Sequence, residues 1–371
     1  MRQAPEILPL ATNKPNLLII AFLAFKSSPE SRGNMMSFSR PPMKSPAQVL
    51  FSGETPFPIL PAVDHYAGSE RLILKALDLQ AQLGPIFDIT CDCEDGAPAG
   101  AEAAHAEMVA GLIASPGNRY DRVGLRIHDI THPHWRRDLE ITLPRCGDRL
   151  PFITLPKACR LDDVRTQIAS LRQIEAALGI ERPIPVHVLI ETHGALRQVW
   201  DIAALPGVES LDFGLMDFVS GHHGAIPAWA MTSPGQFEHP LVARAKAEIS
   251  AAALANGIVP THNVTTELTD IEVIRNDARR AREQFAYLRM WSIHPNQILP
   301  IVEALRPDFS EVETAMAILT AAQDNAWGPI QHAGKLHDRA SYRYWFDLLA
   351  RARVTGMALP EAARQRFFPT S

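Results

Sequence analysis

Residues 186–192 read Val-His-Val-Leu-Ile-Glu-Thr, an almost wholly apolar run that ends in a carboxylate. A strand this apolar is typical of a parallel sheet that is covered on both faces. An ionisable side chain directly after such a strand is costly to bury without a partner. Glu191 therefore marks either a structural ion pair, with Lys157 or Arg126 as its partner, or a functional site at the end of the strand.

The same arrangement, a short apolar strand followed by a helical stretch, repeats eight times along the chain. This alternation predicts an α/β protein with a (β/α)8 TIM barrel. An open doubly wound sheet is the alternative, but its usual glycine-rich turn, G-x-G-x-x-G, does not occur in the sequence. The predicted strands are 57–60, 86–90, 122–127, 152–155, 186–190, 210–213, 258–260 and 287–291, and the predicted helices include 70–83, 101–114, 162–178, 196–204, 241–256 and 270–282.

We place the barrel at residues 51–306 and a C-terminal helical segment at 307–371. Beyond Pro307, helical patterns at 310–322 and 342–353 no longer alternate with strands. A segment of this size is too small to be an independent fold. We therefore expect it to pack on the barrel or on a neighbouring subunit.

Residues 1–50 differ from the body of the chain. The stretch 27–46 is rich in Ser, Pro, Met and Arg and has no apolar period, which indicates disorder. The apolar run 17–25 is far shorter than the roughly 20 residues that span a bilayer. We interpret the segment as disordered or as sequence ahead of a true start at Met35 or Met36, with a signal-peptide core as the alternative.

The composition argues against several classes of partner. The 371 residues include 36 Lys+Arg and 41 Asp+Glu, which gives a net charge of −5, and they contain no long basic run. Neither a nucleic acid nor a membrane surface is an expected partner for such a chain. The four cysteines have no repeated spacing, so they indicate reduced thiols and a cytoplasmic protein.

Ionisable side chains follow several of the predicted strands. The strand ends of a TIM barrel meet at one rim, where the active sites of these proteins lie. Carboxylates at a rim are the hard oxygen ligands typical of Mg²⁺, and the His and Cys spacings of zinc sites do not occur in the sequence. The side chains concerned are Asp92, Glu94, Asp95, Arg126, Lys157, Glu191 and Asp217.

Each of these groups also has a structural interpretation. The acidic stretch after the second strand fits a solvated loop or the first turn of a helix. Asp217 fits a helix N-cap, and Arg126 and Lys157 fit salt bridges at the rim. Cys91 and Cys93 are interpreted as small core residues rather than ligands.

Taken together, six short motifs in a fixed order resemble the citrate lyase β-subunit-like branch of the HpcH/HpaI aldolase superfamily, which includes the malyl-CoA lyases. The match covers most of the chain between residues 57 and 350. The family patterns D-x-E-D-A, V-R-I-N, L-P-K, E-T-x-x-G, F-G-x-x-D and I-H-P-x-Q are similar to residues 92–97, 125–128, 155–157, 191–194, 213–217 and 293–297.

The resemblance implies a TIM barrel that cleaves a carbon–carbon bond in a 2-hydroxy carboxylate or a hydroxyacyl thioester, of the citryl-CoA or malyl-CoA kind, through a metal-stabilised enolate. Glu191 and Asp217 are implied to hold Mg²⁺. Arg126 is implied to bind the carboxylate of a 2-oxo or 2-hydroxy acid, with the backbone around Gly214 and Leu215 as further donors. The residues implied to orient these groups are Asp92, Glu94, Asp95 and Lys157.

The resemblance further implies a homotrimer or a hexamer whose C-terminal segment reaches a neighbour's active site. The family element G-x-M-x-D is similar to residues 334–338, so Asp338 is the implied acid/base from another subunit. Residues 64–70 depart from the family's first loop, a G-S-R-P-like segment that holds CoA. The metal site is expected to be intact, and whether the protein uses CoA is left open.

Two other functions fit the same residues. One is a class II pyruvate aldolase, which uses a metal, an arginine and a histidine base without CoA, and His262 or His128 is the candidate base. The other is a non-catalytic barrel that binds a small anion. It would be expected to lack a key ionisable group, and none of the six motifs does.

Overall fold

The structure is a computed structural model that describes residues 46–51, 56–96 and 99–368. The predicted disordered extension, the short apolar run and the predicted start at Met35 or Met36 lie outside the described residues. The expected boundary at residue 50 is wrong, because Pro46–Leu50 forms the short helix α1. Its Leu50 is buried in the apolar cluster of the C-terminal segment, so α1 belongs to the folded body.

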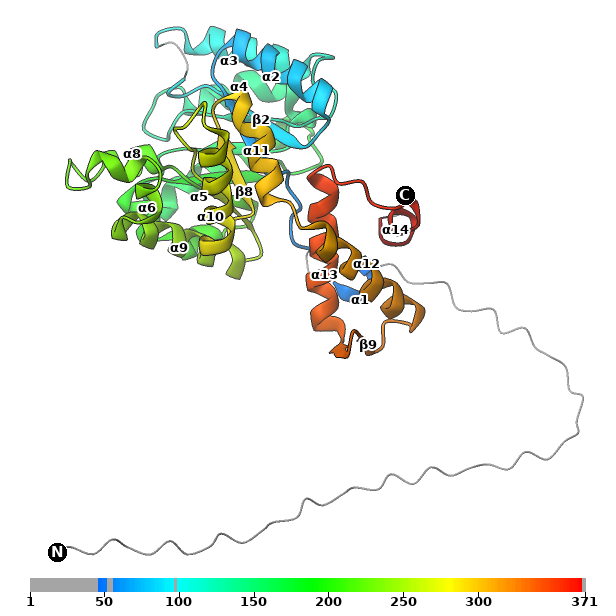
Figure 1. The fold of residues 1–371 in the computed structure, drawn as a ribbon. Helices are drawn as coiled ribbons and strands as arrows, with labels where there is room; N and C mark the ends of the chain where they lie inside the picture. The colour runs from blue at the N-terminus through cyan, green and yellow to red at the C-terminus, as the bar shows by residue number, and fades with distance from the viewer. Residues whose placement is uncertain (1–45, 52–55, 97–98, 369–371) are drawn as a thin grey trace, which may run out of the picture. The chain divides into compact units, whose positions relative to one another are not determined.

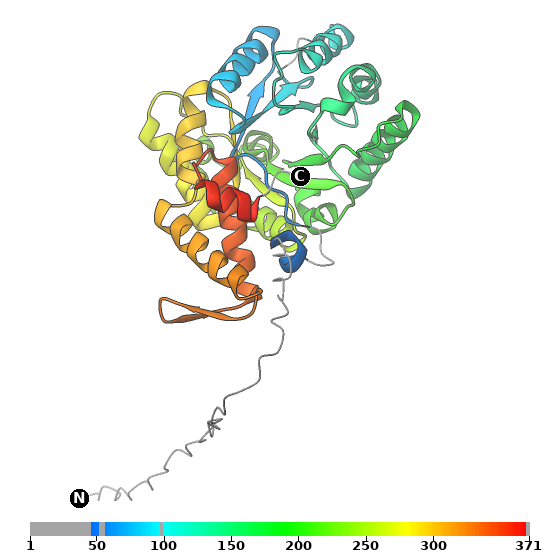
Figure 2. The same cartoon turned by 90° about the vertical axis from the view of Figure 1, so that its right-hand side faces the viewer.

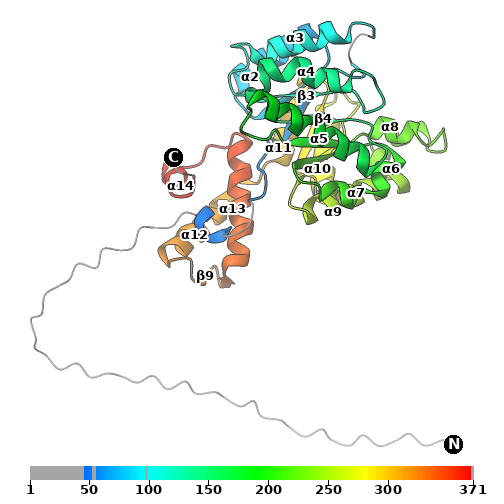
Figure 3. The same cartoon turned by 180° about the vertical axis from the view of Figure 1, so that it is seen from behind.

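The predicted TIM barrel is confirmed. Its strands are parallel and close in sequence order from β1 to β8 (Figure 2), with the helices outside them (Figures 1 and 3). The strands are β1 (Val63–Ala67), β2 (Phe87–Asp92), β3 (Val123–Arg126), β4 (Ile153–Leu155), β5 (Val186–Ile190), β6 (Val208–Phe213), β7 (Val259–His262) and β8 (Arg289–Ser292). The barrel helices are α2 (Glu70–Leu83), α3 (Glu102–Ala114), α4 (Trp135–Cys146), α5 (Leu161–Leu178), α6 (His193–Arg197), α7 (Val199–Ala203), α8 (Leu215–Ser220), α9 (Pro240–Ala255), α10 (Ile271–Phe285) and α11 (Pro295–Leu305).

The prediction of a first strand at 57–60 is wrong, because the strand is Val63–Ala67. This strand carries three polar side chains in five residues, a composition that favours a loop. Asp64 accepts a hydrogen bond from Thr90 at 2.7 Å and is buried inside the barrel. Polar groups that find partners across a barrel interior remove the apolar signal on which a strand prediction depends.

The partners of Asp64 form a buried ionic layer in the barrel interior. The guanidinium of Arg289 lies 2.9 Å from Asp64 Oδ2 and 2.9 Å from Asp88 Oδ2, and all three side chains are 0% exposed. These residues stand at the beginnings of β8, β1 and β2. The layer is therefore at the opposite end of the barrel from the rim where the strands finish. The side-chain nitrogen or oxygen atoms of His187 and Asp212 that could ligate a metal lie within 4.8 Å of a carboxylate oxygen of Asp64.

The C-terminal segment has a hydrophobic cluster of its own, built from α12 (Phe309–Asp324), α13 (Arg339–Val354), α14 (Glu361–Phe367) and α1. The expectation that it contains helices only is wrong. The strands β9 (Ile330–His332) and β10 (Lys335–His337) pair antiparallel as a hairpin (Figure 2). Its turn residues, Ala333 and Gly334, have φ of 46° and 76°, as the favoured two-residue hairpin turn requires.

None of the helices in the described part of the chain combines the length and the apolarity needed to cross a membrane.

Replacing Arg289 by Ala is expected to lower the free energy of unfolding by about 3–5 kcal/mol, because it leaves the buried Asp64 without its cation and Asp88 with only Arg122 at 3.7 Å. Urea unfolding followed by circular dichroism measures this loss. The matched control is Arg165→Ala, which breaks an exposed ion pair with Asp162 and should cost less than about 1 kcal/mol. Equal losses in the two variants would contradict a structural role for the interior pair.

Candidate active site

The predicted site residues lie at the carboxyl ends of successive strands. Asp92 is the last residue of β2, Arg126 is the last residue of β3, and Glu191 directly follows β5. Because the strands are parallel and adjacent, these ends share one rim. Lys157 follows β4 by two residues, and Asp217 lies in the first turn of α8 after β6.

A side-on ion pair joins Arg126 to Asp92. Arg126 donates from Nε to Asp92 Oδ1 at 2.6 Å and from Nη2 to Oδ2 at 2.9 Å, and both side chains are buried. Its Nη1 lies 3.3 Å from Glu94 Oε2. Burial alone would raise the pKa of Asp92, but the hydrogen bonds and the charge of Arg126 hold it below its usual value. The pair therefore stays ionised.

Tyr66 of β1 also belongs to this group, although the sequence pattern does not single it out. Its hydroxyl donates to Asp92 Oδ2 at 2.5 Å, and its ring centroid lies 5.2 Å from the guanidinium carbon of Arg126. A Cβ on Gly96 would lie 1.9 Å from the tyrosine hydroxyl, so only glycine leaves room for this contact. No signal in the sequence points to Tyr66, because the polar composition of its strand favours a loop.

Lys157 links the acidic loop to Glu191. Its Nζ lies 2.7 Å from Glu94 Oε1 and 2.7 Å from Asp95 Oδ1, while its peptide N–H donates to Glu191 Oε1 at 2.7 Å. Lys157 has φ of 50°, which is uncommon for a residue other than glycine. Such backbone conformations concentrate at functional sites, and here it orients both ends of the residue toward acids.

Glu191 and Asp217 form a pair of carboxylates with incomplete charge compensation. Glu191 is only 3% exposed, and burial followed by the negative charge of Asp217 raises its pKa to about 8. The charge of Arg126 acts on Glu191 in the opposite direction. A Cβ on Gly214 would lie 2.2 Å from Glu191 Oε2, so glycine is needed beside this carboxylate. Oxygen donors with uncompensated negative charge suit a hard divalent cation such as Mg²⁺.

Gly214 and Leu215, the two predicted backbone donors, differ in whether their N–H groups already have a hydrogen-bond partner. The N–H of Gly214 already donates to the carbonyl of Ile190 at 3.3 Å. Leu215 is the first residue of α8, and the first N–H groups of a helix have no partner within the helix. The predicted donor role of Gly214 stays a prediction, and the structure adds that glycine at this position leaves room for Glu191.

Asp338 is not brought to the rim within one chain. It is exposed and caps α13, accepting from the N–H of Ala340 at 3.1 Å. No hydrogen bond or ion pair joins it to the rim residues in the part of the chain that the structure describes. Its predicted role requires a second subunit and stays a prediction.

The two candidate histidine bases have different surroundings. His262 is the last residue of β7, is fully buried, contacts Lys246 of α9 and stacks on Phe237 at 5.3 Å. His128 follows β3, and its Nδ1 lies 2.6 Å from the buried carboxylate of Asp138. Burial alone would lower the pKa of His128, but Asp138 raises it above its usual value.

A closed parallel barrel with an arginine and paired carboxylates at its rim defines a TIM-barrel protein built to bind a small anion beside a cation. The chain belongs to the HpcH/HpaI aldolase/citrate lyase family, whose sequence profile matches residues 88–290. The predicted resemblance is thereby confirmed.

Several known proteins are similar to the chain. An L-malyl-CoA/beta-methylmalyl-CoA lyase of Cereibacter sphaeroides is 30% identical over 270 residues, which are 69% of this chain and 84% of the relative. A malyl-CoA/beta-methylmalyl-CoA/citramalyl-CoA lyase of Chloroflexus aurantiacus is 24% identical over 294 residues, 75% of this chain and 84% of the relative.

Solved structures agree with the fold. A citrate lyase from Burkholderia xenovorans is 56% identical to this chain, with a TM-score of 0.75. The match covers 87% of this chain and 100% of that one. The CitE protein of Mycobacterium tuberculosis, solved with magnesium, acetoacetate and coenzyme A, has 21% identity and a TM-score of 0.58 over 79% of this chain and 98% of that one. The second likeness supports the barrel fold alone.

The His128–Asp138 contact predicts a measurable pH dependence. Because the carboxylate raises the pKa of His128 in the folded state, its stabilising contribution is full below the unfolded value of about 6.5 and is lost as the pH rises through the folded value. Asp138→Asn should lower that pKa. NMR titration of ¹⁵N-labelled histidines measures both, and His128→Asn assigns the signal. An unchanged titration in Asp138→Asn would exclude the contact.

Proposed function

We propose that the protein is a Mg²⁺-dependent carbon–carbon lyase that cleaves a 2-hydroxy carboxylate or its hydroxyacyl-CoA thioester. The observation that carries the proposal is the pair Glu191 and Asp217 beside Arg126, at the rim of a barrel in the aldolase/citrate lyase family. The curated relatives are carbon–carbon lyases acting on malyl-CoA and similar thioesters, which supports the same class of reaction here.

In this proposal Glu191 and Asp217 hold Mg²⁺. Burial and then the negative charge of Asp217 raise the pKa of Glu191 to about 8, and a divalent cation between the two carboxylates would favour the ionised form. Magnesium is present in the related Mycobacterium tuberculosis structure. When bound, such an ion polarises substrate oxygens and favours loss of the hydroxyl proton.

Arg126 binds the substrate carboxylate. Its Nε and one Nη2 hydrogen are occupied by Asp92, and its Nη1 lies 3.3 Å from Glu94, so a ligand would use the remaining hydrogens of Nη1 and Nη2. Because Asp92, Glu94 and Tyr66 hold the guanidinium in place, little side-chain entropy is lost when the anion binds. A fixed positive charge at this position also stabilises the enolate oxygen that develops as the carbon–carbon bond breaks.

The remaining requirement is proton transfer. Breaking the bond leaves an electron pair on the enolate, which must take up a proton to give the released acid or thioester. We propose that Asp338 of a second copy takes the hydroxyl proton and returns it to the enolate carbon, since this exposed residue lies at the end of a hairpin in its own chain. This assignment requires a homo-oligomer, which we propose is a trimer or a hexamer. The four cysteines are free, which supports our proposal of a cytoplasmic protein.

A second candidate is the class II pyruvate aldolase. The His128–Asp138 contact favours it, because a histidine oriented by a carboxylate is a suitable general base. Offering glyoxylate or an aldehyde together with pyruvate, and separately with acetyl-CoA, distinguishes the two reactions. Condensation with acetyl-CoA supports the proposed lyase, and condensation with pyruvate alone supports the aldolase.

Replacing Glu191 or Asp217 by Ala should reduce Mg²⁺-dependent cleavage of malyl-CoA by at least about 100-fold, since loss of even an outer group of a metal site costs about 10–100-fold. Release of the thioester product measures activity. The control is Asp201→Asn on α7, an exposed acid away from the rim, which should leave activity unchanged. Unchanged turnover in Glu191→Ala or Asp217→Ala would exclude the metal assignment.

Supply of Asp338 by a second subunit is tested by mixing inactive variants. Asp338→Ala and Glu191→Ala chains are each expected to be inactive alone. Co-expressed, they should recover activity, because some sites then combine an intact rim with an intact Asp338 from the neighbour. Absence of recovery in oligomers shown to contain both chains would refute delivery between subunits.

A further inference from the structure

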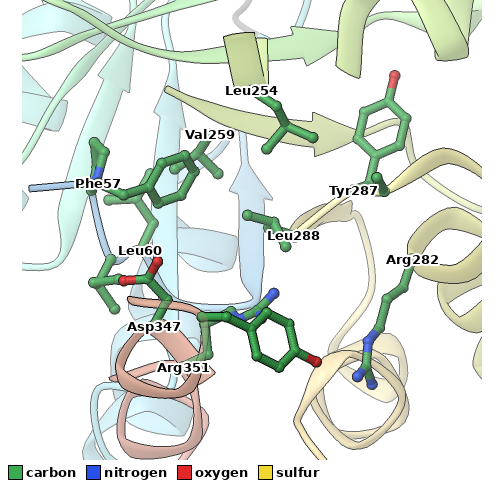
Figure 4. A pocket seen from close by; sticks show the side chains of 13 residues that line it. Phe57, Leu60, Leu254, Val259, Arg282, Tyr287, Leu288, Asp347 and Arg351 are labelled. Carbon is green, nitrogen blue, oxygen red and sulfur yellow. The ribbon is translucent and has the colours of Figure 1, made fainter. Parts of the chain in front are cut away.

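A cavity of about 570 Å³ lies at the end of the barrel opposite the rim. Its barrel wall includes Leu60, which precedes β1, Val259, which begins β7, and Leu288, which precedes β8. The facing wall includes Asp347 and Arg351 of α13 (Figure 4). The volume is within the range of about 300–1,000 Å³ that is usual for small-molecule sites.

The cavity is lined by Arg351, whose side chain has no hydrogen-bond or ion-pair partner among the described residues. Arg351 makes no hydrogen bond or ion pair with any residue between 46 and 368 that the structure describes, and its Nε is buried. Burial, followed by the nearby charge of Arg282, lowers the pKa of Arg351. Arg351 as a whole is partly exposed, but a buried Nε without a hydrogen-bond partner is unfavourable, because its lost hydration is not replaced.

No described hydrogen bond or ion pair joins Arg351 to the other charged groups of the lining, although the negative charge of Asp347 acts on it. Arg282 donates to the carbonyl of Arg306 at 2.9 Å and lies 3.8 Å from Glu311. Asp347 is the carboxylate of the lining, and among the described ion pairs none joins it to Arg351. Two guanidinium groups and one carboxylate give the lining a formal charge of 2 − 1 = +1.

The rest of the lining is largely apolar. Phe57, Leu60, Leu254 and Leu288 face the same space as Arg351 (Figure 4). A small inorganic anion would leave this apolar surface in contact with water, and a neutral apolar molecule would leave Arg351 unpaired. A ligand with one negative charge and an apolar body satisfies both walls.

We propose that this cavity is a second ligand site, which binds an organic monoanion with an apolar body, with the anionic group on Arg351. The chemical class is that of a medium-chain carboxylate. The site is separate from the rim, so the proposal does not depend on the lyase function. A multiply charged anion is disfavoured, because Asp347 faces the same cavity.

Isothermal titration calorimetry of the full chain with decanoate tests the proposal. Decanoate should bind saturably with one molecule per chain, whereas decanol, with the same chain and no charge, should bind at least about 10-fold more weakly. Arg351→Gln should weaken decanoate binding by about 10-fold, in line with the loss of a charge-assisted hydrogen bond. Asp347→Asn should strengthen it, because a repelling carboxylate is removed.

Two controls distinguish binding at Arg351 from binding elsewhere on the protein. Arg353→Gln removes an exposed charge from the same helix and should leave decanoate affinity unchanged. Glu191→Ala should also leave it unchanged, which distinguishes the cavity from the rim. Absence of saturable binding, equal affinity for decanol, equal affinity in Arg351→Gln, or loss of binding in Glu191→Ala would each overturn the proposal. If Arg351→Gln fails to fold, the proposal is still tested by the weaker binding expected for decanol and by the stronger decanoate binding expected for Asp347→Asn.

Discussion

The side-on ion pair between Arg126 and Asp92 is the interaction on which the rim depends. Asp92 accepts two hydrogen bonds from that guanidinium, one from the hydroxyl of Tyr66, and two from the backbone N–H groups of Glu94 and Gly96. The acidic loop after β2 is thus folded around one buried carboxylate. A buried charge with this many partners is rigid, because moving it would break several charge-assisted bonds together.

From this pair, contacts run across four neighbouring strand ends. Glu94 lies between Arg126 and Lys157, and the peptide N–H of Lys157 holds Glu191 after β5. Each link joins residues from different strands, so the arrangement exists only when these neighbouring strands are paired in the folded sheet. The network leaves the charge of Glu191 and Asp217 incompletely compensated, and this is the property that makes the rim suitable for a cation.

The molecule deals with buried charge in three different ways. In the barrel interior, Arg289 is paired by Asp64 and Asp88, which serves stability. At the rim, positive and negative groups are paired but leave an excess of carboxylate, which serves binding. At the opposite end, Arg351 faces an apolar cavity without a described protein partner, which we attribute to a ligand. Because burial of charge always requires a counter-charge or a loss of stability, the manner of pairing separates structural from binding sites.

Local patterns along the chain were enough to predict the barrel and most rim residues, because strand–helix alternation and polar groups at strand ends are both readable in short segments. They did not reveal Tyr66. The polar side chains of β1 find their partners on β2 and β8, which local patterns along the chain do not show. These patterns could not show that the N–H of Gly214 donates to the carbonyl of Ile190, or that the ring of His262 contacts Lys246 of α9. These points depend on the folded barrel, because the direction of a side chain and the occupancy of its hydrogen bonds follow from which strands closure brings together.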